Sequence, residues 1–305
     1  MTLKIVPGDC EIIACETQEQ WLAERLKGIG ASESAALFGA SHWDSPYSIW
    51  ARKTGKSGEK KQNTRMRLGQ ILEDSIAALY GEMIGVPLID YGRTALLRST
   101  KWPLLQATLD RAVAKLEGED GPGVVEIKHT SQPGWAASPP TQYEIQVQHQ
   151  LAVTGWQWGR LVIENDGEIT EHRIARNEKF IDLLVRDVQS FWTDHVEKLH
   201  PPAVDGSKPT EAALKEVLGR ASGRIVELGS DVVDIDKELQ NLDEQLERID
   251  GKKRELRNKL IALIGDASEA LLPNGVKYTY KEQSRKATVT QASTFRVLRR
   301  IEVRQ

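Results

Sequence analysis

Apolar residues recur every three to four positions in several stretches of the chain, which is the spacing of an amphipathic helix. Between residues 64 and 84, Leu68, Leu72, Ile76 and Leu79 fall on one side of such a helix. Similar spacing continues in two later stretches and, in interrupted form, near the N-terminus. The expected helices cover residues 21–37 (in two parts), 64–84, 142–154 and 177–199.

The first of these stretches is interrupted by the letters G-I-G. The interruption predicts two short helices between residues 21 and 37. Ser32 is a capping-type residue and Glu33 an acid suited to a first turn, so we expect the second helix to begin there.

Runs of β-branched and other apolar residues between these helices predict strands. They lie at residues 95–97, 105–114 and 124–128, and a further run, G-R-L-V-I-E, follows the expected helix 142–154. An order of helices, consecutive strands, a helix and more strands indicates an α/β (α+β) fold with a mixed sheet flanked by helices.

The last hundred residues have a different pattern, in which apolar residues alternate at spacings of four and three. This is the heptad seam of a coiled coil, and it predicts one helix of about 36 residues that needs a partner to cover its seam. The partner could be the chain itself, another copy or another protein. The seam consists of Leu228, Val232, Ile235, Leu239, Leu242, Leu246, Ile249, Leu256, Leu260 and Leu263, with Lys253 as its polar interruption.

A Pro- and Gly-containing segment, H-P-P-A-V-D-G-S-K-P-T, marks an expected domain boundary after residue 199. We therefore expect one domain over residues 1–205. The extension, residues 206–305, would hold the long heptad helix and a small basic tail that begins like a β-hairpin at P-N-G-V-K-Y-T-Y-K-E-Q.

Composition narrows the class of protein. The chain has 305 residues, with 41 basic and 44 acidic side chains and a net charge of −3. Binding to nucleic acid would therefore depend on a local cluster of basic residues. Two cysteines, Cys10 and Cys15, make no disulfide framework and by themselves no zinc or iron–sulfur site. With no signal-peptide or membrane-spanning pattern, we expect a soluble cytoplasmic protein without a membrane partner.

The letters V-V-E-I-K at residues 124–128 place two charges in an apolar strand. Alternation along a strand puts Glu126 and Lys128 on one face and Val125 and Ile127 on the other. Taken alone, a solvated edge strand with an ion pair explains this pattern better than a catalytic site does.

Asp110, in L-Q-A-T-L-D-R-A-V, makes a catalytic site a stronger alternative to the solvated ion pair. A short turn-rich link separates it from Glu126, so the two segments can pair as antiparallel strands and bring both carboxylates to one end of the sheet. Neighbouring carboxylates are costly without a cation between them, and a hard divalent ion such as Mg²⁺ is the usual solution. Lys128 could then orient or deprotonate a water, or stabilise negative charge on a phosphate, which is typical of a phosphodiesterase.

Other polar residues are weaker candidates. Glu73 could be a third carboxylate, although an exposed acid on a helix face explains it equally well. Tyr143, Gln146 and Gln150 recur at positions i, i+3 and i+7 of a helix, where they could contact phosphate oxygens or simply form a solvated face. Trp135 lies in a Pro-rich loop and could stack on a base.

Five short motifs occur in order over roughly residues 21–162, namely G-I-G-A-S, L-G-Q-I-L-E-D, A-T-L-D, V-V-E-I-K and Y-x-x-Q-V-Q. Together they resemble the YqaJ family of phage recombination nucleases, which includes lambda exonuclease. Each motif is weak alone, but five in one order are specific. The resemblance implies the restriction-endonuclease-like fold of the PD-(D/E)xK superfamily.

The resemblance also implies roles for residues at the centre of the site. Asp110 and Glu126 correspond to metal ligands, and Lys128 corresponds to the catalytic lysine. Glu73 matches the family's helix carboxylate, and the backbone carbonyl of Ile127 is a further candidate ligand. The expected ion is Mg²⁺, with Mn²⁺ as a substitute.

A second group of residues would contact DNA. Gln146 matches the family's glutamine motif beside the active site, with Tyr143 next to it. Arg25 and Ser32, with Thr108 as a weaker third, align with the segment that binds a 5′-terminal phosphate. A guanidinium and hydroxyls are good phosphate donors, although an N-cap alone would explain Ser32.

The chain departs from the family in two places. Arg111 occupies a position that is often Gly, so it could alter the approach to the metal or contact DNA. The heptad extension is absent from lambda exonuclease, so that protein's trimer cannot be assumed, and a homo-oligomer remains one of the open arrangements.

The leading interpretation is a magnesium-dependent exonuclease that digests linear double-stranded DNA from the 5′ end. It would release 5′-mononucleotides and leave 3′ tails for a single-strand annealing protein, in a bacterial or phage-infected cell. A structure-specific or nicking endonuclease of the same fold is the alternative within the enzyme class. A non-catalytic DNA-binding or assembly protein that uses the coiled coil is the alternative from another class.

Overall fold

The computed structural model describes residues 8–59, 62–132, 134–135 and 137–284, and the chain divides into two compact units, Met1–Gly219 and Arg220–Gln305. The helices are α1 (Gln18–Arg25), α2 (Ala31–Leu37), α3 (Pro46–Lys53), α4 (Thr64–Ile84), α5 (Thr141–Thr154), α6 (Glu178–Phe191) with a π-helical turn η1 (Trp192–Glu197), α7 (Lys208–Leu218) and α8 (Val232–Ile264). The strands are β1 (Cys10–Ala14), β2 (Ile29–Gly30), β3 (Leu88–Ile89), β4 (Ala95–Ser99), β5 (Leu105–Ala107), β6 (Arg111–Val113), β7 (Gly123–Thr130), β8 (Trp158–Asn165), β9 (Glu168–Ala175), β10 (Glu269–Leu271) and β11 (Lys277–Thr279).

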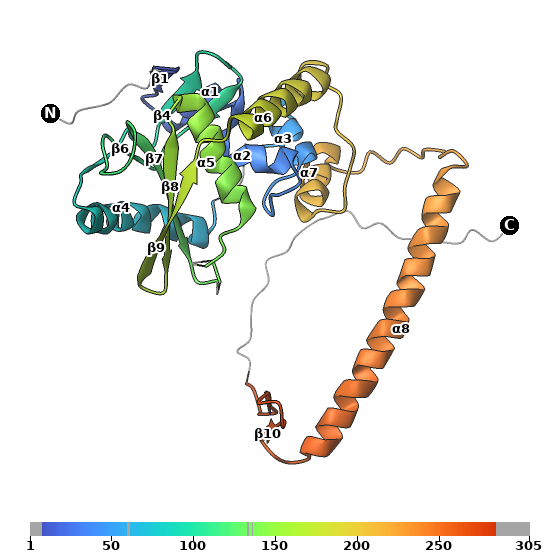
Figure 1. Ribbon diagram of the computed structural model, residues 1–305. Helices are drawn as coiled ribbons and strands as arrows, with labels where there is room; N and C mark the ends of the chain where they lie inside the picture. The colour runs from blue at the N-terminus through green and yellow to red at the C-terminus, as the bar shows by residue number, and fades with distance from the viewer. Residues whose placement is uncertain (1–7, 60–61, 133, 136, 285–305) are drawn as a thin grey trace. The chain divides into compact units, whose positions relative to one another are not determined.

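The first unit is built on a mixed sheet flanked by helices (Figure 1). Within the described residues this central sheet has five strands in the order β3-β6-β7-β8-β9, with β7 and β8 parallel and the other neighbours antiparallel. A second sheet, β1-β4-β5-β2, lies in the same unit. The expected α/β fold with a mixed sheet between helices, followed by a long C-terminal helix, is confirmed.

Alternation along β7 assigns its two faces to different helices. Val125 and Ile127 pack with Ile76 and Tyr80 of α4, whereas Val124 belongs to the cluster that includes the apolar residues of α5. Glu126 and Lys128 therefore lie on the same sheet face as α5, not on a solvated face. The strand pattern predicted the alternation correctly. It could not indicate that α5 covers the face with Glu126 and Lys128 and makes it part of the interior.

The buried side of α4 differs from the expected one. The helix has the predicted bounds, but Leu68 and Leu79 are 44% and 49% exposed, while Ile76, Ala77 and Tyr80 are buried. Leu79 is exposed although it lies between Ile76 and Tyr80 along the helix, so the buried side is rotated from the predicted stripe towards Ala77 and Tyr80.

The expected strand at residues 105–114 is in fact two strands in different sheets. β5 pairs with β4, and after a break at Thr108–Asp110 the chain continues as β6, which pairs with β7. The break places Asp110 at the junction of the two sheets. A continuous apolar run could not indicate this, because both halves are buried.

The start of α2 also differs from the expected one. The N-cap is Gly30, so Ser32 lies inside the first turn, and the Glu33 carboxylate accepts a hydrogen bond from the Gly30 N–H at 2.8 Å. Glu33 thus satisfies one of the unpaired amides at the helix start, and Ser32 is not needed as a cap.

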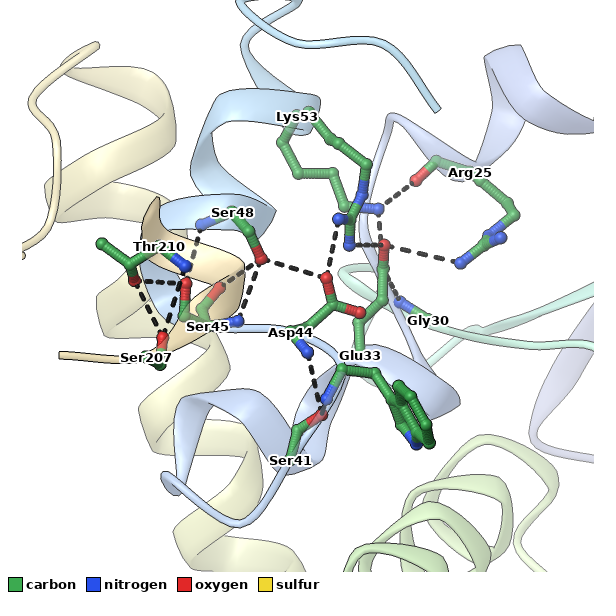
Figure 2. A network of polar contacts seen from close by, with 12 residues as sticks. Arg25, Gly30, Glu33, Ser41, Asp44, Ser45, Ser48, Lys53, Ser207 and Thr210 are labelled. Atoms are coloured by element: carbon green, nitrogen blue, oxygen red, sulfur yellow. Dashed lines mark hydrogen bonds and ion pairs between the residues drawn. The ribbon is translucent and has the colours of Figure 1, made fainter. Parts of the chain in front are cut away.

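A buried ion-pair network fixes the N-terminal helices around Glu33, which is 4% exposed (Figure 2). Lys53 Nζ lies 2.7 Å from Glu33 Oε2, and Arg25 and Arg52 each place a nitrogen 3.4 Å from Glu33 Oε1. Burial alone would raise the pKa of Glu33, but the three cations hold it well below its usual value. The network ties α1, α2 and α3 together.

The same network extends to α7. Arg52 contacts Asp44 at 2.7 Å. Ser45, the residue after Asp44, accepts a hydrogen bond from the hydroxyl of Thr210 in α7 at 2.7 Å (Figure 2). The first compact unit consequently runs to Gly219 and includes α7, which lies beyond the boundary expected at residue 205.

The second unit contains α8, which has 33 residues, and a hairpin of β10 and β11. Leu228 precedes the helix, so the seam begins at Val232 and is shorter than expected. The hairpin turns at Leu272–Val276, near the predicted P-N-G letters. The basic tail from residue 285 lies outside the described residues. In the described part of the chain, no helix has the length and apolarity needed to cross a membrane.

Gly123 is required where β7 meets β8, because a Cβ there would lie 2.4 Å from the indole of Trp158, its partner on β8. We expect Gly123→Ala to lower the free energy of unfolding by about 1–3 kcal/mol through overpacking. Gly69→Ala, in α4 with no heavy atom within 4 Å of the added Cβ, should instead raise it by up to about 1 kcal/mol. Urea denaturation of both variants measures their free energies of unfolding. Equal changes in the two variants would contradict the predicted overpacking at Gly123.

Glu33→Gln should lower the free energy of unfolding of the first unit by about 3 kcal/mol or more, because it leaves buried cations without their counter-ion. Glu211→Gln, which breaks a fully exposed pair with Lys215, is the control and should change stability little. Urea denaturation followed by tryptophan fluorescence measures both. An equally small effect at Glu33 would show that the network contributes no net stability.

Candidate active site

A pocket of ≈ 190 Å³ collects most of the residues that the sequence singled out. Its walls come from α1, the start of α2, the β4–β5 sheet, β7 and α5, which are far apart in the sequence. Glu73, Ile127, Tyr143 and Arg111 are not among its lining residues. The pocket is lined by Trp21, Arg25, Gly30, Ala31, Ser32, Leu96, Ala107, Thr108, Asp110, Glu126, Lys128 and Gln146.

Asp110 and Glu126 meet as expected, because β6 and β7 are antiparallel neighbours with Arg111 opposite Val125. The Ile127 N–H donates to Asp110 Oδ2 at 2.8 Å, which fixes the carboxylate against β7. Burial, followed by the negative charge of Glu126, raises the pKa of Asp110 to about 7. The two carboxylates are therefore held together at an electrostatic cost.

Glu126 is fully buried, and its oxygens are satisfied from α5 and β7. Gln146 Nε2 donates to Oε1 at 2.7 Å, and Gln150 Nε2 donates to Oε2 at 2.6 Å. Lys128 also donates to Oε1 and forms an ion pair with it. These donors offset part of the cost of burying the charge.

Lys128 lies between the carboxylates and the aromatic side of the site. Burial alone would lower its pKa, but the charges of Glu126 and Asp110 raise it overall. Its ammonium lies 5.2 Å from the ring centre of Tyr143, and that ring lies 5.4 Å from the ring of Trp135. Tyr143 is thus next to the lysine although it does not line the pocket. The next residue on β7, His129, contacts Glu164 of β8.

Glu73 and Arg111 form a separate arrangement beside Asp110. Arg111 is 7% exposed and contacts Glu73 at 3.2 Å, Asp74 and the Asp110 carbonyl. Burial, and then the charge of Asp110, raise the pKa of Glu73, while Arg111 acts in the opposite direction. Glu73 is therefore affected by the charge of Asp110, and it shares Arg111 with Asp74.

Arg25, Ser32 and Thr108 also line the pocket. The Arg25 guanidinium lies over the Trp21 ring at 4.7 Å, and the Trp21 Nε1–H donates to the Thr108 hydroxyl at 3.1 Å. Glu33 contacts Arg25 at 3.4 Å, so the guanidinium that lines the pocket is held by an ion pair.

Several residues that support the pocket could not be recognised from sequence patterns alone. The spacing of Gln150 indicates only a polar helix face, yet the side chain is completely buried against Glu126. Arg52 and Lys53 resemble the solvated basic end of a short helix, and no spacing links them to Glu33. The i, i+4 repeat of Gln146 and Gln150 is the one signal that could have indicated a shared partner.

The carboxylate pair has the chemistry of a divalent-cation site. In the described part of the chain, no three His, Cys, Asp or Glu side chains form a metal site by themselves. Mg²⁺ commonly binds through one or two carboxylates and keeps waters or substrate phosphates as its other ligands. Asp110 and Glu126 fit that pattern, since a cation between them would relieve the repulsion that raises the pKa of Asp110.

Comparisons with solved structures find similar chains at low identity. An alkaline exonuclease (LHK-Exo) from Laribacter hongkongensis is 23% identical, with a TM-score of 0.48, over 60% of this chain and 96% of that one. A phage-related exonuclease from Haemophilus somnus 129PT is 13% identical, with a TM-score of 0.45, over 56% of this chain and 96% of that one.

Sequence comparisons find a similar protein and a matching domain model. The uncharacterized protein YqaJ of Bacillus subtilis (strain 168) is 30% identical over 208 residues, which are 66% of this chain, and the match spans 63% of that relative. A family model described as the YqaJ-like viral recombinase domain matches residues 20–157, the region that holds the whole pocket. The resemblance seen in the five motifs is confirmed, since residues 20–157 match the model of the YqaJ-like viral recombinase domain and 208 residues align with the YqaJ protein.

Proposed function

We propose that the protein is a magnesium-dependent deoxyribonuclease that degrades linear double-stranded DNA from its 5′ ends. The 3′ single strands that remain would serve phage-type homologous recombination, with a single-strand annealing protein as partner. The observation that carries the proposal is that Asp110, Glu126 and Lys128 line one pocket together with Arg25. The match of residues 20–157 to the YqaJ-like viral recombinase domain supports it.

In this proposal Asp110 and Glu126 hold Mg²⁺, or Mn²⁺ in its place, with the Ile127 carbonyl and Glu73 as further candidate ligands. The bound ion would supply Lewis-acid stabilisation of negative charge on the scissile phosphate. Gln146 and Gln150 keep the Glu126 carboxylate in one orientation through hydrogen bonds of 2.7 and 2.6 Å. The metal-binding face is therefore positioned before DNA binds.

Lys128 is placed to act on the reacting phosphate. Its ammonium is fixed by Glu126 and lies beside Tyr143, so it can orient the attacking water or stabilise the negative charge that develops. Water attacks phosphorus, the bond from phosphorus to the 3′ oxygen of the terminal nucleotide breaks, and a proton restores the 3′ hydroxyl. The products are a 5′-mononucleotide and a DNA strand that again ends in a 5′-phosphate.

The part of the pocket around Arg25 suits that 5′-phosphate. Arg25 presents a guanidinium, and Ser32 and Thr108 present hydroxyls, all lining the same pocket as the carboxylates. Because each cut produces a new 5′-phosphate, the same residues can bind the strand again after each step. Arg111, held by acidic side chains, is a less favourable DNA contact than Arg25.

Lys128→Ala and Asp110→Asn should each lower the rate of digestion of linear 5′-phosphorylated duplex DNA by about a hundredfold or more, through loss of charge stabilisation and of a metal ligand. Asp110→Asn should fold at least as stably as the wild type, because it removes one of two repelling carboxylates. Lys179→Ala, on exposed α6 surface, is the matched control and should retain full activity.

The digestion assay also separates the alternatives. With Mg²⁺, the wild type should degrade linear duplex and spare closed circular DNA, and EDTA should stop the reaction. Cleavage of the circle would replace the exonuclease with an endonuclease. If neither substrate is cut while DNA is still bound, the protein is a binding or assembly factor and the proposal fails.

Arg25→Ala should reduce the preference for 5′-phosphorylated over 5′-hydroxyl ends by about tenfold, because a charge-assisted phosphate contact is lost. The ratio of the two initial rates measures this, since a general loss of activity cancels in it. Arg186→Ala, an exposed arginine on α6, should leave the ratio unchanged. An unaltered ratio for Arg25→Ala would remove Arg25 from the phosphate site.

A further inference from the structure

We infer that α8 pairs with α8 of a second copy of this chain as an antiparallel two-stranded coiled coil. The proposal concerns the second unit and does not depend on the nuclease function. The heptad pattern indicates that α8 needs a partner. It does not indicate which chain is the partner or whether the two helices run parallel or antiparallel.

The seam of α8 has no partner within the second unit among the described residues. Seven of its side chains, among them Leu242 and Leu246, are between 46% and 84% exposed, and no residue of α8 is buried. In heptad positions, the a sites are Val232, Leu239, Leu246, Lys253 and Leu260, and the d sites are Ile235, Leu242, Ile249, Leu256 and Leu263. Ten seam positions over 33 residues, about 50 Å of helix, are enough for a stable two-stranded pair.

The charges along α8 are segregated between its two halves. Residues 232–250 contain seven acidic and two basic side chains, and residues 251–264 contain five basic and one acidic. The halves thus carry net charges of −5 and +4. A parallel pair in register would place like charges side by side along its whole length, whereas an antiparallel pair places the acidic half against the basic half.

The positions that flank the seam lead to the same choice. In a parallel pair each g residue faces the e residue five positions later on the partner, so Glu238 would face Asp243 and Lys252 would face Arg257. Both contacts are repulsive. In the antiparallel pair g faces g and e faces e, so Glu238 faces Lys259 and Asp236 faces Arg257. Asp243 against Asp250 is the one repulsive contact between charged e or g residues.

Lys253 also fits only one direction. A parallel pair in register would place the two Lys253 side chains against each other in the seam, where burial and repulsion both oppose their charges. The antiparallel register that matches all ten seam positions places Lys253 opposite Leu242, and Leu246 opposite Ile249. The two lysines are then separated by about eleven residues along the axis, roughly 16 Å, and each ammonium can extend to the helix edge.

The test is sedimentation equilibrium of the full-length protein and of charge variants at low salt. We expect a dimer that Leu246→Asp, in the centre of the seam, converts to a monomer with the thermal unfolding of the first unit unchanged. Glu238→Lys should weaken the dimer about tenfold, because it places lysine opposite Lys259 at two symmetry-related contacts. The double variant Glu238→Lys with Lys259→Glu should restore wild-type affinity.

Glu247→Lys makes the same charge change at an outward-facing b position and should leave the dissociation constant unchanged. A parallel coil would respond to Glu238→Lys by tightening, since the new lysine would face Asp243. Tightening would therefore overturn the antiparallel arrangement. A wild-type protein that is monomeric up to about 50 μM, or a dimer that survives Leu246→Asp, would overturn pairing through α8 altogether.

Discussion

The close approach of a buried and a half-buried carboxylate at the junction of two sheets is the constraint on which the site depends. Glu126 has no exposed surface, and Asp110 lies close enough for the Glu126 charge to raise its pKa. Such a pair is tolerated because Lys128, Gln146 and Gln150 all donate to Glu126. Much of the local sequence, including the two glutamines one turn apart on α5, is explained by the need to stabilise that charge.

A second buried carboxylate organises the part of the pocket around Arg25. Glu33 satisfies the start of α2 and neutralises part of the charge of Arg25, Arg52 and Lys53, which belong to α1 and α3. Arg25 lines the same pocket of ≈ 190 Å³ as Asp110 and Glu126. In the proposed reaction, the two carboxylates would hold the metal ion and Arg25 would bind the terminal phosphate.

The second unit differs from the first in the burial of its apolar residues. It has almost no core of its own, since no residue of α8 is buried, and its apolar residues are arranged to be covered from outside. The acidic and basic halves of α8 also favour one direction of pairing, the antiparallel one. The seam and the pocket belong to different units, so catalysis and assembly can be examined with separate variants.

Local pattern in the sequence determined a good part of this structure. The helix at residues 64–84, the alternation of Glu126 and Lys128 against Val125 and Ile127, and the antiparallel approach of Asp110 to Glu126 all follow from spacing and short links. Long-range packing decided the rest. Whether Glu126 faces water or α5, whether residues 105–114 form one strand or two, and whether Lys53 is solvated or paired with Glu33 depend on elements distant in sequence. Periodicity records only which face of an element is apolar, and the tertiary structure alone determines what each face meets.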